Sequence, residues 1–299
     1  MNQSISIEFP NAITLTIKRE DLIHPFISGN KFRKLKYNLL QAKSENQETL
    51  LTFGGAFSNH IAAVAYAGKE QGFKTIGIIR GDELREKIVD NPTLLFAQEC
   101  GMEFEFVSRE AYRLKNEPSF IVDLKQKFGQ FYLVPEGGTN ELAVKGCEEI
   151  LTEDDAVFDF VCCSIGTGGT ISGIINSILP HQKVLGFPSL KGDFLKEEIR
   201  NFARINTNWE LITDYHFGGY GKISPELIDF INQFYVTTTI PLDPIYTGKM
   251  VFGVIDLIKR NYFPENSKIL LIHTGGIQGV KGMNIKLKNK KLPIINIYD

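Results

Sequence analysis

Short apolar runs of strand length alternate with segments of helical periodicity along most of the chain. Helical patterns such as 61–72 and 92–101 follow these runs, and Asn91-Pro92 is typical of a helix start while Gly101 is typical of a helix end. This β-then-α order predicts an α/β fold with mostly parallel sheets and helices on both faces. The predicted strands are 50–53, 75–79, 103–107, 131–134, 158–163, 183–187 and 269–273.

The densest run of positive charge, from Lys281 to Lys291, contains the alternating segment Ile285-Lys286-Leu287-Lys288. Strict alternation predicts a half-exposed strand whose lysines face solvent. The four cysteines have no zinc spacing, and no metal site is predicted. Adjacent Cys162 and Cys163 lie in an apolar run, so we expect both to be core thiols.

The composition is that of an ordinary globular protein. The 299 residues can form one large or two small domains, 43% of them are hydrophobic, and the net charge is −2. No global basic field therefore favours nucleic acid or an anionic membrane as a partner. No apolar run reaches membrane-spanning length and the first residues lack a secretory pattern, so we expect a cytoplasmic protein.

The segment from Ser28 to Tyr37 opens a predicted helix and is rich in cations. A solvated basic helix face is the ordinary interpretation. Lys31, however, follows Gly29-Asn30 at the helix start, near backbone N–H groups that disfavour positive charge and make its proton easier to lose. A neutral lysine amine can form a Schiff base with a carbonyl, including that of pyridoxal phosphate. This hypothesis requires a phosphate cradle, a partner for the ring nitrogen and a carboxylate site elsewhere in the chain.

Residues 51–60 run from a predicted strand through glycines into a predicted helix. Simple N-capping accounts for one of Ser58 and Asn59 but leaves the other unexplained. Free N–H groups at the helix start, with Ser58 and His60 beside them, predict a carboxylate-binding pocket. Asn59 can donate a hydrogen bond to a phenolate-type oxygen.

A second glycine-rich turn, Gly166-Thr167-Gly168-Gly169-Thr170, joins a predicted buried strand to an apolar helix. Its backbone N–H groups and the helix dipole favour a cradle for a monophosphate. The turn is not a P-loop, because no Gly-Lys-Ser/Thr follows, and it is not a dinucleotide fingerprint, because Ile171 stands where glycine is needed. A tight strand-to-helix turn alone would need only one glycine.

Tyrosines lie in two further loops, 217–221 with Tyr220 and 243–249 with Tyr246, each of which alone is typical of an ordinary turn. Thr274 and two glycines follow His273 at the end of a predicted strand, where α/β sheets expose their sites. From the sequence, His273 is equally consistent with a satisfied core histidine and with a ligand group.

In this order the motifs resemble those of the fold-type II pyridoxal phosphate enzymes, and more narrowly the branch with 1-aminocyclopropane-1-carboxylate deaminase and D-cysteine desulfhydrase. The resemblance spans nearly the whole chain and includes Lys18-Arg19-Glu20-Asp21 and Asp243-Pro244-Ile245-Tyr246-Thr247-Gly248-Lys249. It implies a two-lobed fold like that of tryptophan synthase β, with twisted parallel sheets flanked by helices, and a homodimer. We expect a large cofactor domain from residues 1–44 and 146–299, a smaller inserted domain from 45–145, and the site in the cleft between them.

The resemblance also implies the site roles. Lys31 would bind the cofactor and later move the substrate proton, with Ser58, Tyr220 and Tyr246 as further candidate catalytic residues. Asn59 would contact the cofactor's ring oxygen, and Tyr220 and Tyr246 would flank a small amino-acid substrate. The phosphate would be held by Lys34 and by Gly166, Thr167, Gly168, Gly169 and Thr170, and the substrate carboxylate by Ser58, Asn59 and His60.

Thr247 and Thr274, expected next to the cofactor and substrate, distinguish the two activities of the branch. Its deaminases carry glutamate at the first position and leucine at the second, whereas threonine at both matches D-cysteine desulfhydrase. A carboxylate beside the pyridine nitrogen makes the ring a strong electron sink, and a threonine hydroxyl does not. The resemblance therefore predicts β-elimination from a small D-amino acid, most directly D-cysteine to pyruvate, ammonia and hydrogen sulfide.

Two alternatives stay open at this point. One is opening of the cyclopropane ring of 1-aminocyclopropane-1-carboxylate to 2-oxobutyrate, and the other is a cofactor-binding protein without significant catalysis. Glu136 departs from the family, which commonly has a small apolar residue there. If its loop borders the pocket, this carboxylate is expected to repel an acidic substrate or to bind an amine.

Overall fold

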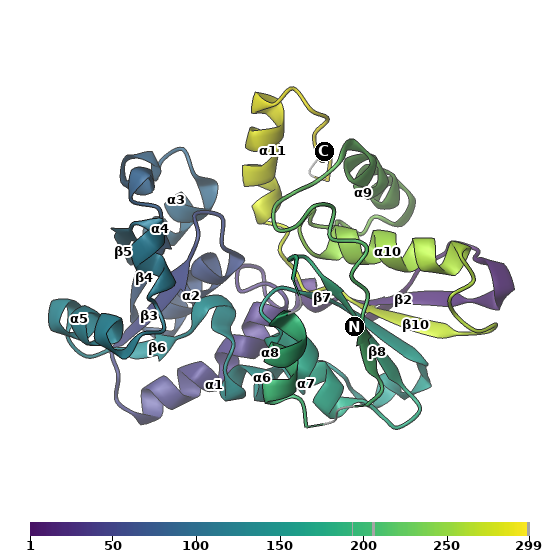
Figure 1. The fold of residues 1–299 in the computed structure, drawn as a ribbon, viewed down its shortest axis with the longest axis horizontal. Helices are drawn as coiled ribbons and strands as arrows, with labels where there is room; N and C mark the ends of the chain where they lie inside the picture. The colour runs from purple at the N-terminus through teal and green to yellow at the C-terminus, as the bar shows by residue number, and fades with distance from the viewer. Residues whose placement is uncertain (193, 205–206, 298–299) are drawn as a thin grey trace.

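The computed structural model describes residues 1–192, 194–204 and 207–297, and its strands form two separate sheets. Figure 1 shows the four-stranded sheet on the left and the six-stranded sheet on the right, with helix α1 (Asn30–Ser44) along the lower edge between them. The predicted α/β fold with two lobes is confirmed.

The larger sheet has the strand order β1-β2-β10-β7-β8-β9. All neighbouring pairs are parallel except β1 and β2, which are antiparallel. Its strands are β1 (Asn2–Ser4), β2 (Thr14–Lys18), β7 (Phe160–Ile165), β8 (Lys183–Pro188), β9 (Trp209–Leu211) and β10 (Lys268–Ile272).

Helices pack on both faces of the larger sheet. Cys162 belongs to the cluster that contains α9 (Pro225–Thr238), α10 (Thr247–Lys259) and α11 (Gly279–Asn289). The adjacent Cys163 belongs to the cluster of α7 (Gly169–Ser177) and α8 (Phe194–Phe202) on the opposite face. Both thiols are fully buried, which confirms that they are core residues.

The smaller sheet is entirely parallel, in the order β5-β4-β3-β6. Its strands all fall inside the segment 45–145 that was expected to form the inserted domain, whose boundaries stay a prediction. They are β3 (Thr49–Gly54), β4 (Lys74–Arg80), β5 (Met102–Val107) and β6 (Tyr132–Val134). The helices of this part of the chain are α2 (Asn59–Gln71), α3 (Pro92–Glu99), α4 (Arg109–Arg113), α5 (Pro118–Phe128) and α6 (Glu141–Cys147).

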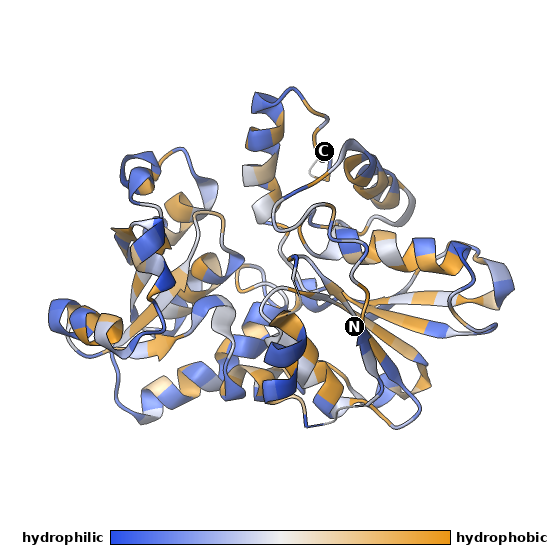
Figure 2. Ribbon diagram, viewed as in Figure 1, coloured by the Kyte–Doolittle hydropathy of each residue, from blue (hydrophilic) through white to orange (hydrophobic). Residues whose placement is uncertain are grey.

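Short 3₁₀ segments complete the described secondary structure: Pro10–Ala12, Glu20–Leu22, Asp82–Lys87, Glu136–Gly138 and Glu153–Val157. Figure 2 shows that the strands of both sheets are mostly hydrophobic, whereas the helices carry hydrophilic residues along one side. Over the described ranges, none of the helices combines the length and the apolar character needed to cross a bilayer.

All seven predicted strands are confirmed, with bounds shifted by one or two residues. The predicted strand in the run from Lys281 to Lys291 is wrong, because residues 279–289 form helix α11. Its buried residues include Val280, Met283 and Leu287, which recur at helical spacing, while the neighbouring Ile285 is exposed. The lysines of the run are exposed, as expected.

Candidate active site

A cavity of about 920 Å³ lies between the two lobes, lined by loops at the ends of strands from both sheets. Most of the predicted site residues line it: Lys31, Lys34, Ser58, Asn59, His60, Gly166, Thr167, Gly168, Thr170, Tyr220, Tyr246 and Thr274. Among the described residues, Gly169 and Thr247 were predicted for the site but do not line this cavity.

The start of α1 is placed by a close approach between Gly29 and the loop after β10. Gly29 has φ +61°, and a Cβ atom on it would lie 2.0 Å from the carbonyl oxygen of Thr274. The next residue, Asn30, donates its backbone N–H to the same oxygen at 3.2 Å. Only glycine allows this approach, so Gly29 fixes the position of Lys31 relative to Thr274.

The Lys31 amine has lost much of its affinity for a proton. Its Nζ donates to Asn30 Oδ1 at 3.1 Å, and Asn30 Nδ2 donates in turn to Thr170 Oγ1 at 2.8 Å. Burial, followed by the charge of Lys34, lowers the pKa of Lys31 from its ordinary 10.5 to about 7. The direction was predicted from the helix start, but burial and Lys34 are its causes. Near neutral pH a large share of this amine is an uncharged nucleophile.

Lys34 links the two lobes at the glycine-rich turn. Its buried Nζ donates to the carbonyl oxygen of Gly137 and to Thr139 Oγ1, both at 2.9 Å, and to Thr167 Oγ1 at 3.4 Å. A Cβ atom on Gly169 would lie 3.2 Å from the same Nζ, so the backbone of the turn passes close to the ammonium. Burial lowers the pKa of Lys34 to about 8. A cation beside free N–H groups is suited to a phosphate.

At the start of α2, Ser58 is the N-cap, since its Oγ accepts a hydrogen bond from Ile61 N at 3.3 Å. Asn59 begins the helix and lies against the loop before α11, where a Cβ atom on Gly276 would be 3.0 Å from its Nδ2. Both side chains line the cavity. The start of α2 therefore borders the cavity, and the carboxylate site expected there and the individual roles of Ser58 and Asn59 stay predictions.

His60 lies beneath the cavity floor, with 2% of its surface exposed. Thr52 Oγ1 donates to the carbonyl oxygen of Val134 at 2.8 Å, so it accepts from His60 Nε2, also at 2.8 Å. The imidazole is uncharged, because burial, Lys31 and Lys34 hold its pKa well below the ordinary value. Its Nδ1 is a buried acceptor without a partner in the described part of the chain. Its predicted contact with a substrate carboxylate remains a prediction.

Tyr220 and Tyr246 lie together on the large-lobe side, with ring centroids 6.2 Å apart. Burial raises the pKa of both phenols, and that of Tyr246 is raised further by Tyr220 and Asp243. Both hydroxyls therefore keep their protons at neutral pH. The loop that carries Tyr220 is held by Lys249, a buried lysine of α10 that sequence reasoning missed. Its Nζ donates to the carbonyl oxygens of His216 at 2.9 Å and Gly219 at 3.0 Å.

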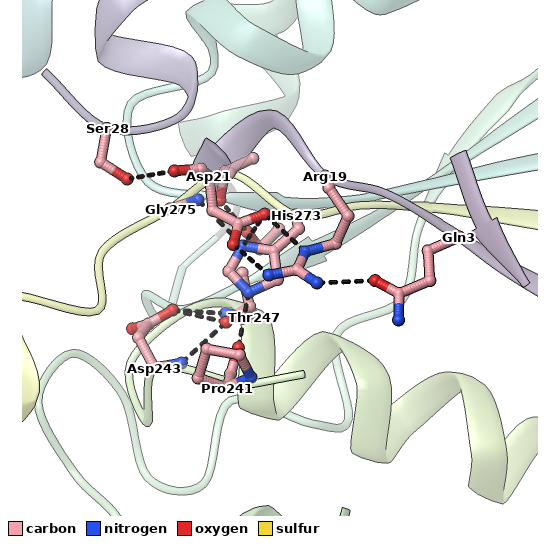
Figure 3. A network of polar contacts seen from close by, with 11 residues as sticks. Gln3, Arg19, Asp21, Ser28, Pro241, Asp243, Thr247, His273 and Gly275 are labelled. Carbon is pink, nitrogen blue, oxygen red and sulfur yellow. Dashed lines mark hydrogen bonds and ion pairs between the residues drawn. The ribbon is translucent and has the colours of Figure 1, made fainter. Parts of the chain in front are cut away.

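Asp243 accepts hydrogen bonds at the start of α10 and makes two hydrogen bonds with the Thr247 hydroxyl (Figure 3). Its carboxylate accepts hydrogen bonds from the backbone N–H groups of Ile245, Tyr246 and Thr247 and from Thr247 Oγ1, at 2.8 to 3.0 Å. Thr247 Oγ1 also accepts from Asp243 N at 2.9 Å, and Thr247 has no exposed surface. The Thr247 hydroxyl therefore already donates its proton to Asp243 and is buried. Its predicted contact with a cofactor stays a prediction.

The hydroxyls that line the cavity between β7 and β10 belong to Ser164 and Thr274, whose Oγ atoms are 3.2 Å apart. Sequence reasoning missed Ser164, although its position at the strand end before Gly166 was a usable signal. His273 is a satisfied core histidine. Its Nε2 donates to the carbonyl oxygen of Pro241 at 2.7 Å, and its Nδ1 accepts from Gly275 N at 3.2 Å, as Figure 3 shows.

The motif Lys18-Arg19-Glu20-Asp21 forms ion pairs with residues next to the site but does not itself line the cavity. Arg19 makes two hydrogen bonds to Asp21, at 2.9 and 2.7 Å, and Asp21 lies 3.5 Å from His273 Nδ1 (Figure 3). Arg33, on α1, makes two hydrogen bonds to buried Glu20, at 2.8 and 3.1 Å. These contacts fix the position of α1 relative to the loop after β10.

The donor set fits pyridoxal phosphate. The nucleophilic Lys31 would bind its aldehyde, and the buried ammonium of Lys34 at the glycine-rich turn would bind its phosphate. The hydroxyls of Ser164 and Thr274 at the strand ends would contact its ring. A family model described as pyridoxal-phosphate dependent enzyme matches residues 6–275.

Individual relatives agree with this match. A mitochondrial protein of Arabidopsis thaliana, named bifunctional D-cysteine desulfhydrase/1-aminocyclopropane-1-carboxylate deaminase, is 31% identical over 302 residues, covering 91% of this chain and 74% of its own length. The 1-aminocyclopropane-1-carboxylate deaminase of Rhizobium rhizogenes is 28% identical and covers 96% of this chain and 94% of its own. A crystal structure of an ACC deaminase homologue superimposes with a TM-score of 0.82 at 29% identity, over 97% of this chain and 93% of the other. The chain therefore belongs to the family of pyridoxal-phosphate dependent enzymes.

Proposed function

We propose that this enzyme catalyses β-elimination on a small D-amino acid, with D-cysteine as substrate and pyruvate, ammonia and hydrogen sulfide as products. The observation that carries the proposal is the pair of hydroxyls, Ser164 and Thr274, at the ends of β7 and β10. The nearby carboxylate of Asp243 accepts four hydrogen bonds at the start of α10. A ring nitrogen met by hydroxyls is a weaker electron sink, which suffices when a thiolate leaves readily.

Bound pyridoxal phosphate would supply an electron sink for the negative charge that develops at the substrate Cα. The Lys31 amine is suited to accept the Cα proton, because a general base works best when its pKa lies near the working pH. Lys34, together with Thr139 and Thr167, would hold the phosphate and so orient the ring.

The two tyrosines would act at the leaving group. Their raised pKa values keep both phenols protonated, so each can donate a hydrogen bond to a departing thiolate. The start of α2, with Ser58 and Asn59, would bind the substrate carboxylate through backbone N–H groups. Uncharged His60 beneath it adds no positive charge to this position.

A second candidate function is deamination of 1-aminocyclopropane-1-carboxylate to 2-oxobutyrate and ammonia. It is favoured by the names of the relatives, since the Rhizobium rhizogenes protein and one activity of the Arabidopsis protein are deaminases of this compound. The resemblance to their branch also supports a homodimer, and the cytoplasmic location expected from the sequence pattern stays a proposal. Light scattering of the purified protein tests for the homodimer, and microscopy of a tagged chain tests the cytoplasmic location.

The deciding experiment offers D-cysteine, L-cysteine and 1-aminocyclopropane-1-carboxylate in parallel to purified, cofactor-loaded protein and identifies the 2-oxo acid released. Pyruvate from D-cysteine alone is the expected result, and the variant Lys31→Ala should release none. Oxobutyrate from the cyclopropane substrate would replace the first candidate by the second. Undiminished turnover by Lys31→Ala would contradict both.

A further inference from the structure

Away from the cofactor end, the cavity wall carries an excess of positive charge. Its cations are Arg80, Arg109, Arg113, Lys115 and Lys286, and its carboxylates are Glu83 and Glu136. Arg109 pairs with Glu83 at 2.9 Å and Lys115 with Glu136 at 3.4 Å. Within the described ranges, Arg80, Arg113 and Lys286 have no carboxylate partner. These three cations lie on β4, α4 and α11, so they approach the cavity from both lobes.

Arg80 is the unpaired cation that lies beside the loop leading to the predicted substrate position. It is the last residue of β4, and a Cβ atom on Gly55 would lie 3.6 Å from its Nη2. Gly55 leads directly to Ser58, the N-cap of α2, where the substrate carboxylate is expected. The charge of Arg80 also acts on Tyr220 of the other lobe, whose pKa it lowers against the effect of burial. The guanidinium therefore lies beside Gly55, in the same cavity that the tyrosine pair lines.

The Tyr112 ring lies beside this guanidinium, and Glu136 holds the hydroxyl of Tyr112. Arg80 lies 5.6 Å from the ring centroid of Tyr112, which Lys115 also approaches at 5.3 Å. The Tyr112 hydroxyl donates to Glu136 Oε1 at 2.7 Å. The carboxylate of Glu136 is thus engaged by Tyr112 and Lys115 and leaves Arg80 free. Lys115 offsets part of the negative charge of Glu136. The expectation that this carboxylate repels an acidic substrate or binds an amine stays a prediction.

We infer that Arg80 forms a second anion subsite, so that the cavity takes an amino acid whose β-substituent carries a negative charge in addition to the α-carboxylate. A guanidinium presents a planar fork of N–H donors that matches a carboxylate or another oxyanion, and it attracts a thiolate by charge. Arg113 and Lys286, which line the same cavity, add to the attraction. The inference rests on the proposed function only in taking the substrate to be an amino acid.

D-aspartate and D-asparagine test the subsite, because they match in size and differ in the charge of the β-substituent. Each is titrated into the cofactor-loaded wild type and into Arg80→Gln, and the change in the cofactor's absorption spectrum gives the dissociation constant. Wild type should bind D-aspartate about tenfold or more tightly than D-asparagine. Arg80→Gln should lose this preference and keep its affinity for D-asparagine.

Arg109→Gln is the matched control, because Arg109 pairs with Glu83 and 73% of its side chain is exposed. Arg109→Gln should keep the preference for D-aspartate. Arg80→Lys should retain part of this preference, because lysine keeps the positive charge but lacks the planar fork of N–H donors. Equal affinity of the wild type for both amino acids would overturn the inference, as would an equal loss for both in Arg80→Gln. A wild type that responds to neither compound would also overturn the inference, whereas the proposed function is decided separately by pyruvate release from D-cysteine.

Discussion

At the scale of single residues, the four cations between positions 31 and 36 have four different environments. Lys31 lines the cavity, Arg33 pairs with buried Glu20, and Lys34 is buried at the glycine-rich turn. Only Lys36, 42% exposed and paired with Glu149, fits the interpretation of a solvated basic face. Composition cannot distinguish them, because their chemistry is set by burial and partners rather than by residue type.

The reactivity of Lys31 should therefore depend on pH unlike that of surface lysines. Only the uncharged amine reacts with acetic anhydride, so labelling rises as the ammonium loses its proton. With a pKa of about 7, Lys31 should label slowly in mild acid, reach half its limiting rate near pH 7 and level off in mild base. Exposed lysines should still be gaining reactivity near pH ~10. Mass spectrometry of the cofactor-free protein after brief labelling measures each site, and a midpoint for Lys31 equal to that of exposed lysines would contradict the assignment.

Gly29→Ala should disrupt the junction that places Lys31. The new Cβ would meet the Thr274 carbonyl oxygen at 2.0 Å, and φ is +61°. We expect a loss of about 3 kcal/mol or more in the free energy of unfolding, together with weaker cofactor binding. Gly72→Ala is the control, since Gly72 has φ +80° but no atom within 4 Å of the added Cβ.

The control should cost only about 1 kcal/mol from backbone strain and leave cofactor binding unchanged. Urea unfolding and spectral titration with pyridoxal phosphate measure both effects. Equal costs for the two variants would show that the close approach of Gly29 to Thr274 does not matter.

At the scale of elements, α10 organises the large-lobe side of the cavity. Asp243 caps its start, Tyr246 precedes its first turn, and Lys249 holds the loop that carries Tyr220. Because Lys249 is buried and donates to two backbone carbonyl oxygens, its removal leaves both acceptors unsatisfied.

Lys249→Met should free the Tyr220 loop without breaking the helix. We expect the free energy of unfolding to fall by about 2 to 4 kcal/mol and amide exchange to accelerate in residues 216–221 more than in α10. Lys259→Met, at the exposed end of the same helix, should change neither. Hydrogen exchange followed by mass spectrometry gives the comparison, and unchanged exchange in 216–221 would refute a holding role for Lys249.

The pattern of the chain predicted the buried parallel strands well, because these strands are short continuous apolar runs. It missed β1 and β9, which have three residues each, and β2, whose sequence Thr-Leu-Thr-Ile-Lys mixes polar and apolar positions. It misassigned α11, since four alternating residues fit both a strand and a helix. Only the longer spacing of Val280, Met283 and Leu287 distinguishes the two.

Residues that line the cavity were predictable where glycine precedes them in a loop that opens a helix, as with Lys31, Asn59 and Thr167, and their roles stay predictions. Residues that enter through long-range contacts were not predictable. Thr139 meets Lys34 across more than a hundred residues, and Arg80 meets Tyr112 from another element. The buried state of Thr247 likewise depends on Asp243, a contact that no sequence pattern displays.

At the scale of the whole molecule, the cavity lies between the two sheets, and α1 contacts the loops of both. Gly29 joins α1 to the loop after β10 of the larger sheet, and Lys34 joins it to the loop after β6 of the smaller one. A cofactor held by Lys31 and Lys34 would therefore bind at the junction of both lobes. Closure of the lobes around it would exclude water from the reacting atoms.

The central claim is that Lys31 is the lysine that holds pyridoxal phosphate, and it can be tested directly. Treatment of the cofactor-loaded protein with borohydride, followed by peptide mapping, identifies the residue to which the cofactor becomes fixed. We expect the phosphopyridoxyl mass on Lys31 alone and none in Lys31→Ala. The same mass on Lys34 or spread over other lysines, or its persistence in Lys31→Ala, would contradict the account.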